Sequence, residues 1–378
     1  MHHRSALGPA DVTDEQLTTM VAASFGADPA RTRLLGSCAT EFPYDLPAIT
    51  TAGRYWVGGE AEVDGATRPY RLFVKHVQSW SRSPLFTDVP PEFRAQAADS
   101  VPWRTEGLAY RSDLGDRLPE GLRMPRALGV FDLDELSTAV WLEEVPVSPG
   151  LWSLDTYVSA ARLLGRLATS RRVAELGDVG RTDFSIRTYL DGRLSIQVLP
   201  MLRDDGIWQH PLVAGAFDRE TRDRLRATGE RAAELVAEVL DHPVATSHGD
   251  ACPNNLLRTD EPGFVLIDYG FWGRQPIGFD LSQLLVGDVQ VGRRTADDLA
   301  EVEDAIVPAY VEGMRAEGDD LPLHVVRRAH ALQLMIFTGL SCLPVEHLAS
   351  EPTPELHRLA AQRSGIARFS LDLLDATA

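Results

Sequence analysis

The chain has 378 residues, 44% hydrophobic and 24% charged, which is ordinary for a globular protein and long enough for two lobes. Its formal net charge of −18 disfavours a nucleic acid or an anionic membrane as a partner. No apolar run is long enough to span a membrane, and the first residues are not typical of a signal peptide. Three scattered cysteines without metal-site spacing indicate reduced thiols, so we expect a cytoplasmic protein, and the abundance of Ala, Arg, Asp, Gly and Leu indicates a bacterial source.

The first 77 residues contain one helix signal and several strand signals. The capping-box pattern of residues 13–16 predicts a short helix that ends near Gly26. Residues 49–77 contain β-prone runs, with turn residues at 58–59 and at 64–65. This spacing predicts an antiparallel meander.

Residues 78–103 are rich in Pro, Ser and aromatic side chains and have no clear period, so we expect a long loop or insertion. Loops of this length are usually functional or mobile, and a protein partner is a possible ligand for this one. A short helix is predicted near residues 106–114. Strand character returns at residues 127–131 and 137–145.

Helix signals dominate after Gly150. Ser153 is a plausible N-cap, and amphipathic patterns predict further helices over residues 218–241, 295–318, 322–341 and 353–375. We therefore expect an α+β protein. Residues 1–146 would form a small antiparallel N-terminal lobe, and residues 147–378 a larger, mainly helical lobe with a catalytic loop at 246–270.

The most informative stretch runs from His248 to Asn255, and Asp268 follows thirteen residues later at the end of an apolar strand. Two short apolar runs between them predict a hairpin that brings Asn255 close to Asp268. An Asp, an Asn five residues later and a second Asp after a strand are typical of phosphoryl transfer. Asp250 would orient or deprotonate the acceptor hydroxyl, while Asn255 and Asp268 would hold Mg²⁺ against ATP. The alternative is a polar hairpin whose carboxylates cap turns.

The pattern His-Gly-Asp-x-x-x-x-Asn, followed by Ile-Asp-x-Gly, resembles the aminoglycoside phosphotransferase and choline kinase-like family, relatives of the protein-kinase fold. The resemblance covers roughly residues 45–345 and is strongest over 246–285. It implies a protein-kinase-like two-lobed fold, with Asp250 as the catalytic base and with Asn255 and Asp268 as Mg²⁺ ligands.

The same resemblance implies that His248 and Asp280 brace the catalytic loop. From the residues alone, Asp280 is also placed to cap a helix that begins near Leu281. His248 is otherwise an ordinary buried histidine with satisfied hydrogen bonds.

Lys75 is the only lysine of the chain and lies in an apolar β-prone run. It is predicted to contact the ATP phosphates, because a compact ammonium suits that role. Glu106, at the start of a predicted helix, is predicted to hold Lys75 in place. The alternatives are a charge on an edge strand for Lys75 and a solvated first-turn carboxylate for Glu106.

The remaining nucleotide contacts are less clearly marked. No Gly-x-Gly-x-x-Gly sequence precedes Lys75, and the nearest candidate phosphate loop surrounds Gly53, where a plain turn is the alternative. Residues 141–145 resemble a hinge that receives adenine through backbone groups, so Glu143 and Val145 are predicted nucleotide contacts. Trp141 is alternatively a core residue.

These residues predict an ATP- and Mg²⁺-dependent O-phosphotransferase whose acceptor is a small molecule such as an aminoglycoside, a sugar or an amino alcohol. Acidic residues after position 287 are suited either to bind ammonium groups or to form a solvated helix face (Asp288, Asp297, Asp298, Glu301 and Asp304). The alternatives are a kinase for Ser or Thr of a biosynthetic peptide, a catalytically silent binding protein of this fold, and a nucleotidyl transferase.

Overall fold

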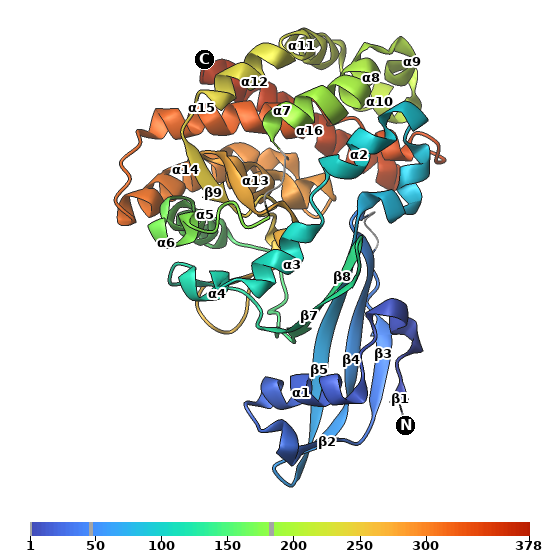
Figure 1. The fold of residues 1–378 in the computed structure, drawn as a ribbon. Helices are drawn as coiled ribbons and strands as arrows, with labels where there is room; N and C mark the ends of the chain where they lie inside the picture. The colour runs from blue at the N-terminus through green and yellow to red at the C-terminus, as the bar shows by residue number, and fades with distance from the viewer. Residues whose placement is uncertain (1, 45–47, 181–184) are drawn as a thin grey trace.

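The computed structural model describes residues 2–44, 48–180 and 185–378. Figure 1 shows a curled sheet at one end of the molecule and a larger helical lobe at the other, with the two chain termini far apart. The predicted α+β, protein-kinase-like two-lobed architecture is therefore confirmed. Within the described ranges, no helix is long and apolar enough to cross a membrane.

The sheet of the first lobe is built on two long central strands. Its seven strands are β1 (His2–His3), β2 (Thr32–Leu34), β3 (Ser37–Glu41), β4 (Thr51–Val63), β5 (Ala66–Gln78), β7 (Ala127–Asp134) and β8 (Ser137–Glu143). Their order is β1-β3-β4-β5-β8-β7, and β2 also pairs with β4. The β1–β3 pair is parallel, and the other pairs described in this sheet are antiparallel.

The hairpin of β4 and β5 confirms one predicted turn and corrects another. Asp64 and Gly65 form the turn, and both have positive φ angles, of 52° and 80°. The turn predicted at residues 58–59 is wrong, because both glycines lie inside β4. A Cβ atom on Gly59 would lie 2.2 Å from the carbonyl oxygen of Gly36. This glycine therefore permits a close backbone approach and does not form a turn.

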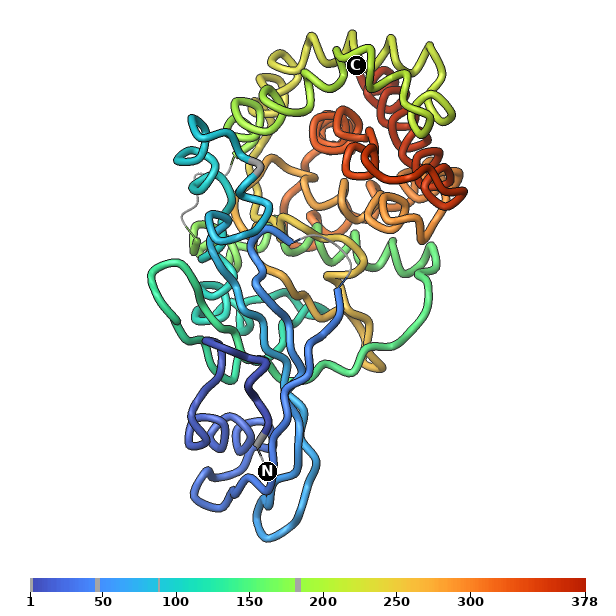
Figure 2. Tube along the Cα trace, turned by 90° about the vertical axis from the view of Figure 1, so that its right-hand side faces the viewer, coloured from blue at the N-terminus to red at the C-terminus, as the bar shows by residue number. Residues whose placement is uncertain are grey.

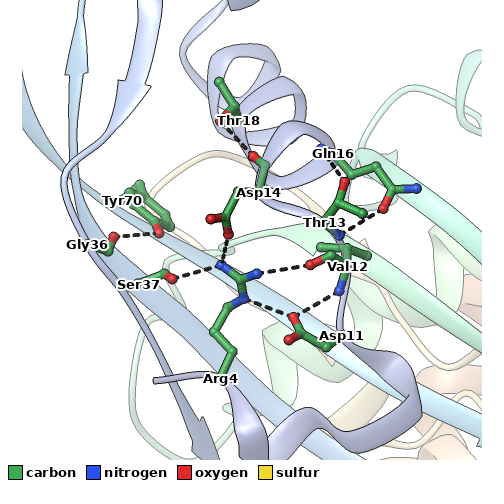
Figure 3. A network of polar contacts seen from close by, with 10 residues as sticks. All are labelled: Arg4, Asp11, Val12, Thr13, Asp14, Gln16, Thr18, Gly36, Ser37 and Tyr70. Carbon is green, nitrogen blue, oxygen red and sulfur yellow. Dashed lines mark hydrogen bonds and ion pairs between the residues drawn. The ribbon is translucent and has the colours of Figure 1, made fainter. Parts of the chain in front are cut away.

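The N-terminal segment is fastened to the sheet by one buried guanidinium. Arg4 donates hydrogen bonds to Asp11, Asp14, Ser37 and the carbonyl oxygen of Val12, as Figure 3 shows. Ser37 lies in β3, while the other partners lie just before or at the start of α1 (Asp14–Phe25). The capping box of α1 and its end at Gly26, where φ is 65°, agree with the sequence prediction.

The insertion at residues 78–103 is not a long irregular loop. It consists of three short 3-10 helices, Trp80–Arg82, Pro84–Asp88 and Pro91–Phe93, followed by α2 (Arg94–Ser100). Trp80 packs edge-on against Phe86, and Arg82 forms an ion pair with Asp134. Figures 1 and 2 show the insertion at the end of the sheet nearest the helical lobe.

Two short helices follow the insertion, α3 (Arg104–Arg111) and α4 (Leu114–Arg117). The predicted helix near residues 106–114 is therefore divided in two. Figure 1 shows α3 between the sheet and the helical lobe. This position makes α3 the helix that can present a side chain to both lobes.

The helical lobe is built around the crossing of α5 and α14. Its longer helices are α5 (Leu154–Thr169), α11 (Arg219–Glu230), α12 (Ala232–Leu240), α13 (Phe279–Gln290), α14 (Leu299–Ala316), α15 (Leu323–Leu334) and α16 (Pro354–Ala376). A Cβ atom on Gly165 would lie 2.0 Å from the carbonyl oxygen of Tyr310, so the glycine permits this crossing. The single helix predicted over residues 218–241 is interrupted at Arg231.

Residues 171–214 contain helices that the sequence patterns did not predict. They are α6 (Arg171–Ala174), α7 (Ile186–Tyr189), α8 (Leu199–Arg203), α9 (Asp205–Gln209) and α10 (Pro211–Ala214). Each has only four or five residues, too few to show a helical period. Leu199, Leu202 and Trp208 place part of this segment in a second hydrophobic core, separate from that of the sheet.

Short strands support the catalytic loop. β9 (Val244–Ser247) pairs with β12 (Gly273–Pro276), β10 (Leu256–Leu257) pairs with β11 (Phe264–Leu266), and β6 (Leu122–Arg123) extends the second pair. The predicted hairpin is confirmed, because Leu256 lies opposite Leu266. The amide of Ile267 also donates a 3.0 Å hydrogen bond to the carbonyl oxygen of Asn255.

Candidate active site

Lys75 lies at the centre of the candidate site. It lies near the C-terminal end of β5, opposite Arg54 of β4 and Val140 of β8. Its Nζ atom is 2.6 Å from Oε2 of Glu106 and 2.9 Å from Oδ1 of Asp268. The structure thus brings together three predicted residues from β5, from α3 and from the end of β11.

The burial of Lys75 and Glu106 excludes the alternative interpretations of both residues. Lys75 is 5% exposed on an inner strand, so it is not a charge on an edge strand, and Glu106 is 3% exposed, so it is not a solvated first-turn carboxylate. Burial alone would lower the pKa of Lys75, but the charges of Asp268 and Glu106 outweigh it and the pKa is raised. A buried ammonium is tolerated only with such partners.

The two carboxylates that share Lys75 have different environments. Burial raises the pKa of Glu106 in spite of the neighbouring ammonium. Burial also opposes the ionisation of Asp268, but Lys75 and then Arg54 outweigh it, so the pKa of Asp268 is lowered. The Asp268 side chain remains 34% exposed. Asp268 is therefore the ionised carboxylate of the cluster that a ligand can reach.

Asp268 has an uncommon backbone conformation. Its φ and ψ angles are 64° and 65°, in the left-handed region that few residues other than glycine adopt. The conformation turns the chain directly after β11, and Tyr269 then enters the hydrophobic core. Such strain is typical of functional sites, where the surrounding packing holds it.

Asp250 and Asn255 lie together in the loop after β9. The amide Nδ2 of Asn255 donates hydrogen bonds to the carbonyl oxygen and to Oδ2 of Asp250, both at 2.9 Å. Burial, and then the charge of Asp268, raise the pKa of Asp250 to about 7. A carboxylate with this pKa is suited to accept a proton near neutral pH.

The start of the loop is held by Asp280 and His248. Asp280 accepts 2.9 Å hydrogen bonds from the amides of His248 and Gly249. Burial lowers the pKa of His248 to about 4, so the ring is neutral at pH 7 and Nε2 donates to the carbonyl oxygen of Ile267 at 3.0 Å. The loop is therefore tied to both α13 and the end of β11. Asp280 is not a helix cap, because α13 begins at Phe279 after Gly278 and the Asp280 carboxylate bonds to the loop.

Gly249 could not be another residue without moving this loop. Its φ angle is 86°, and a Cβ atom would lie 2.0 Å from the carbonyl oxygen of Phe271. The His-Gly-Asp sequence therefore places Asp250 through a backbone conformation that requires glycine.

Gly53 lies in β4 and not in a turn. The pairing of β4 with β5 shifts between Thr51 and Gly53, and the Tyr55 hydroxyl lies 2.3 Å from the position of a Cβ atom on Gly53. The connection between β3 and β4 spans residues 42–50, of which 45–47 lie outside the described residues. The strand signals in the sequence do not include β3, so this connection is not among the predicted phosphate loops.

The structure distinguishes the two predicted hinge residues. The amide of Glu143 donates to the carbonyl oxygen of Arg126 at 3.1 Å, and its carboxylate accepts from the amide of Arg126 at 3.0 Å. Val145 is half-buried, and neither its N–H nor its carbonyl forms a hydrogen bond within the described ranges. Val145 therefore retains backbone groups for a ligand, whereas the N–H of Glu143 is already used. Trp141 is fully buried in the core of the sheet.

The donor atoms at the site fit a magnesium ion that is shared with phosphate. Among the described residues, no group of three or more His, Cys, Asp or Glu side chains is arranged to hold a metal. Asn255 uses its Nδ2 on Asp250, which leaves its Oδ1 as an oxygen ligand, and Asp268 offers an ionised carboxylate. Mg²⁺ usually takes one or two protein oxygens and completes its shell with waters and substrate phosphates.

Comparison with known proteins agrees with this geometry. The phosphotransferase enzyme family APH matches residues 108–316. A search of curated proteins finds no match.

Three solved structures are similar to the chain over most of its length. The amicoumacin kinase hAmiN, in complex with AMP-PNP, Ca²⁺ and Ami, is 12% identical, with a TM-score of 0.51 and coverage of 96% of this chain and 94% of that chain. The Plasmodium vivax ethanolamine kinase is 11% identical, with a TM-score of 0.49 and coverage of 96% and 90%. A microcompartment-associated aminopropanol kinase is 15% identical, with a TM-score of 0.46 and coverage of 96% and 98%. Since the family match spans more than half of the sequence, the chain belongs to the phosphotransferase enzyme family.

Proposed function

We propose that this phosphotransferase transfers the γ-phosphate of ATP, with Mg²⁺, to a hydroxyl group of a small molecule. The observation that carries the proposal is the convergence of Lys75, Glu106 and Asp268 beside the loop of Asp250 and Asn255. A cation, an ionised carboxylate, an amide oxygen and a carboxylate with a pKa of about 7 are the groups that such a reaction requires.

Each group has a role that follows from its environment. Lys75 would bind the phosphates of ATP, and Glu106 would hold its ammonium in place. Asn255 and Asp268 would hold Mg²⁺, which neutralises phosphate charge when bound. Asp250 would accept a hydrogen bond from the acceptor hydroxyl. As the new O–P bond forms and the bond to the ADP oxygen breaks, the hydroxyl proton would pass to the Asp250 carboxylate.

Three of the five acidic residues singled out after position 287 are already engaged, which weakens the case for an ammonium-binding surface there. Asp298 already forms an ion pair with Arg294 at 3.1 Å, and Asp304 forms one with Arg327 at 2.9 Å. Asp288 is buried and accepts a hydrogen bond from the Tyr157 hydroxyl. The proposed acceptor class is therefore an alcohol group in general, borne by an amino alcohol, a sugar or an aminoglycoside.

The other functions remain secondary proposals. A peptide acceptor or a protein partner would use residues 78–103, but Trp80 and Phe86 of this insertion pack against each other. A catalytically silent protein is disfavoured because Lys75, Asp250 and Asp268 are all present and lie together. We also propose that the enzyme works in a bacterial cytoplasm, without nucleic-acid or membrane partners, which is consistent with its three free cysteines and its charge of −18.

The decisive experiment measures acceptor-stimulated release of ADP from Mg-ATP across a panel of amino alcohols, sugars, aminoglycosides and Ser-containing peptides. At least one small-molecule alcohol should stimulate release, and Asp250→Ala should lower the rate by about 10²–10⁴-fold. Asp268→Ala should also abolish most turnover. Near-normal transfer by either variant would refute the assignment, and release of pyrophosphate instead of ADP would indicate a nucleotidyl transferase.

A further inference from the structure

Arg54 is a second cation beside the candidate site and is not among the site residues predicted from the sequence. It lies in β4 directly opposite Lys75 of β5, so the two side chains project from the same face of the sheet. Its guanidinium lies 4.0 Å from the centre of the Tyr44 ring. Arg54 is therefore held half-buried next to the lysine that is predicted to contact phosphate.

The two cations differ in whether neighbouring carboxylates already offset their positive charge. Lys75 is engaged by two carboxylates, Glu106 and Asp268, at 2.6 and 2.9 Å. The Arg54 guanidinium forms no ion pair or hydrogen bond with any residue that the structure describes. The positive charge that faces the site without a carboxylate partner is therefore that of Arg54.

The electrostatics of neighbouring groups place Arg54 at the same site. The three largest influences on the pKa of Asp268 are burial, Lys75 and Arg54, in that order. The charge of Arg54 lowers this pKa and so favours the ionised carboxylate. Burial raises the pKa of Tyr44, Arg54 opposes that rise, and the charges of Asp268 and Asp250 add to it. The Tyr44–Arg54 pair from the sheet thus lies within electrostatic range of both acidic residues of the catalytic loop.

Arg54 differs from the other arginines that lie near aromatic rings. Arg68 and Arg104 also form no ion pair with the described residues, but both are exposed, whereas Arg54 is half-buried beside the site. Others of this group have carboxylate partners. Arg71 lies over Trp56 and pairs with Glu144 at 3.0 Å, and Arg294 lies near Tyr157 and pairs with Asp298. A guanidinium fixed by a ring and not neutralised by a carboxylate is prepared for a phosphate, which it can bind in a bidentate manner.

We propose that Arg54, supported by the Tyr44 ring, binds the terminal phosphates of the nucleotide. This inference rests on the proposed ATP-dependent function and adds a phosphate-binding residue to it. Lys75 alone would present an ammonium that two carboxylates already offset, so Arg54 would supply the net attraction for the polyphosphate.

The test measures the dissociation constants of AMP, Mg-ADP and Mg-ATP by calorimetry for the wild-type chain, Arg54→Gln, Arg54→Lys and Arg68→Gln. Arg68 is the matched control, because it lies in β5 near the Phe25 ring and is exposed, on a part of the sheet away from Lys75. Arg54→Gln should weaken Mg-ATP about 10- to 100-fold, the loss of one or two charge-assisted hydrogen bonds. It should weaken Mg-ADP less and AMP hardly at all, whereas Arg68→Gln should change none of them.

The affinity for AMP reports whether the rest of the nucleotide site is intact. If Arg54→Gln does not fold, Arg54→Lys is the variant that tests the role of Arg54. The lysine keeps the charge but loses the planar fork, so it should recover only part of the Mg-ATP affinity. Equal affinities of Arg54→Gln and wild type for all three nucleotides would overturn the role of Arg54 and leave the proposed function intact. Failure of the wild-type chain to bind any nucleotide would overturn both.

Discussion

The Lys75 ammonium lies 2.6 Å from the Glu106 carboxylate, and both side chains are almost completely buried. This pair joins β5 of the sheet to α3, the helix between the lobes. A buried ion pair contributes little net stability, but the loss of one partner leaves an uncompensated charge. The pair therefore links the position of α3 to the orientation of the phosphate-binding lysine.

Glu106→Ala should destabilise the fold and weaken nucleotide binding together. The expected loss is about 3–5 kcal/mol in the free energy of unfolding, because the Lys75 ammonium would keep only Asp268 as a partner. Chemical denaturation measures this loss. The control is Glu144→Ala, which breaks the exposed pair with Arg71 and should cost less than about 1 kcal/mol. Similar losses in both variants would contradict the structural role given to Glu106.

Gly249→Ala should inactivate the enzyme by displacing the catalytic loop. The added Cβ atom would lie 2.0 Å from the Phe271 carbonyl oxygen at a φ angle of 86°. Misplacement of Asp250 by about 1 Å should lower turnover about 100-fold. Gly26→Ala is the matched control, since Gly26 also has a positive φ angle, 65°, but has no atom within 4 Å of the added carbon. It should lose about 1–2 kcal/mol of stability and keep its activity.

The activity should depend on pH through Asp250. Its pKa in the ligand-free protein is raised to about 7, and only the ionised carboxylate can accept the hydroxyl proton. The value of kcat/KM should therefore rise about tenfold per pH unit below pH 7 and level off above it. Asp268 should not change the profile in this pH range, because its pKa is lowered and its carboxylate stays ionised. A flat profile between pH 5.5 and 8 would exclude Asp250 as the base.

The free energy of unfolding should also depend on pH through the Asp250 carboxyl group. It should fall over the pH range in which the activity rises. Because the pKa of Asp250 is raised from 3.8 to about 7 by folding, protonation favours the folded state, and this stabilisation is lost as the pH rises through about 7. Asp250→Asn removes that dependence. Its unfolding free energy relative to wild type should therefore increase between pH 4 and pH 8 in parallel denaturation series. A difference that stays constant, or decreases, would show that the site does not hold Asp250 as described.

Much of the candidate site could be predicted because spacing and scarcity mark it in the sequence. Asp250, Asn255 and Asp268 occur at intervals that a hairpin brings together, and Lys75 is the only lysine of the chain. Glu106 was inferred from its position at a predicted helix start. These signals are local in the sequence, so they can be recognised without knowledge of the three-dimensional contacts.

The rest could not be predicted because it depends on contacts between distant segments. The prediction of a turn at Gly59 is wrong, since the close approach of Gly36 that requires a glycine there is not visible in the sequence. The carboxylate of Asp280 bonds to amides 31 and 32 positions earlier, so its apparent role as a helix cap was wrong. Arg54 was overlooked because its importance comes from the register of β4 against β5.

The central claim is that a nucleoside triphosphate binds against Lys75, and the composition of the chain allows a direct test. An ATP analogue that carries an acyl group on its terminal phosphate transfers this group to a neighbouring amine. Because Lys75 is the only lysine, peptide mass spectrometry should find one side-chain adduct, at Lys75. Excess Mg-ATP should suppress this adduct, and Lys75→Arg should lack it. Absence of the Lys75 adduct, or a yield that Mg-ATP does not change, would contradict the account.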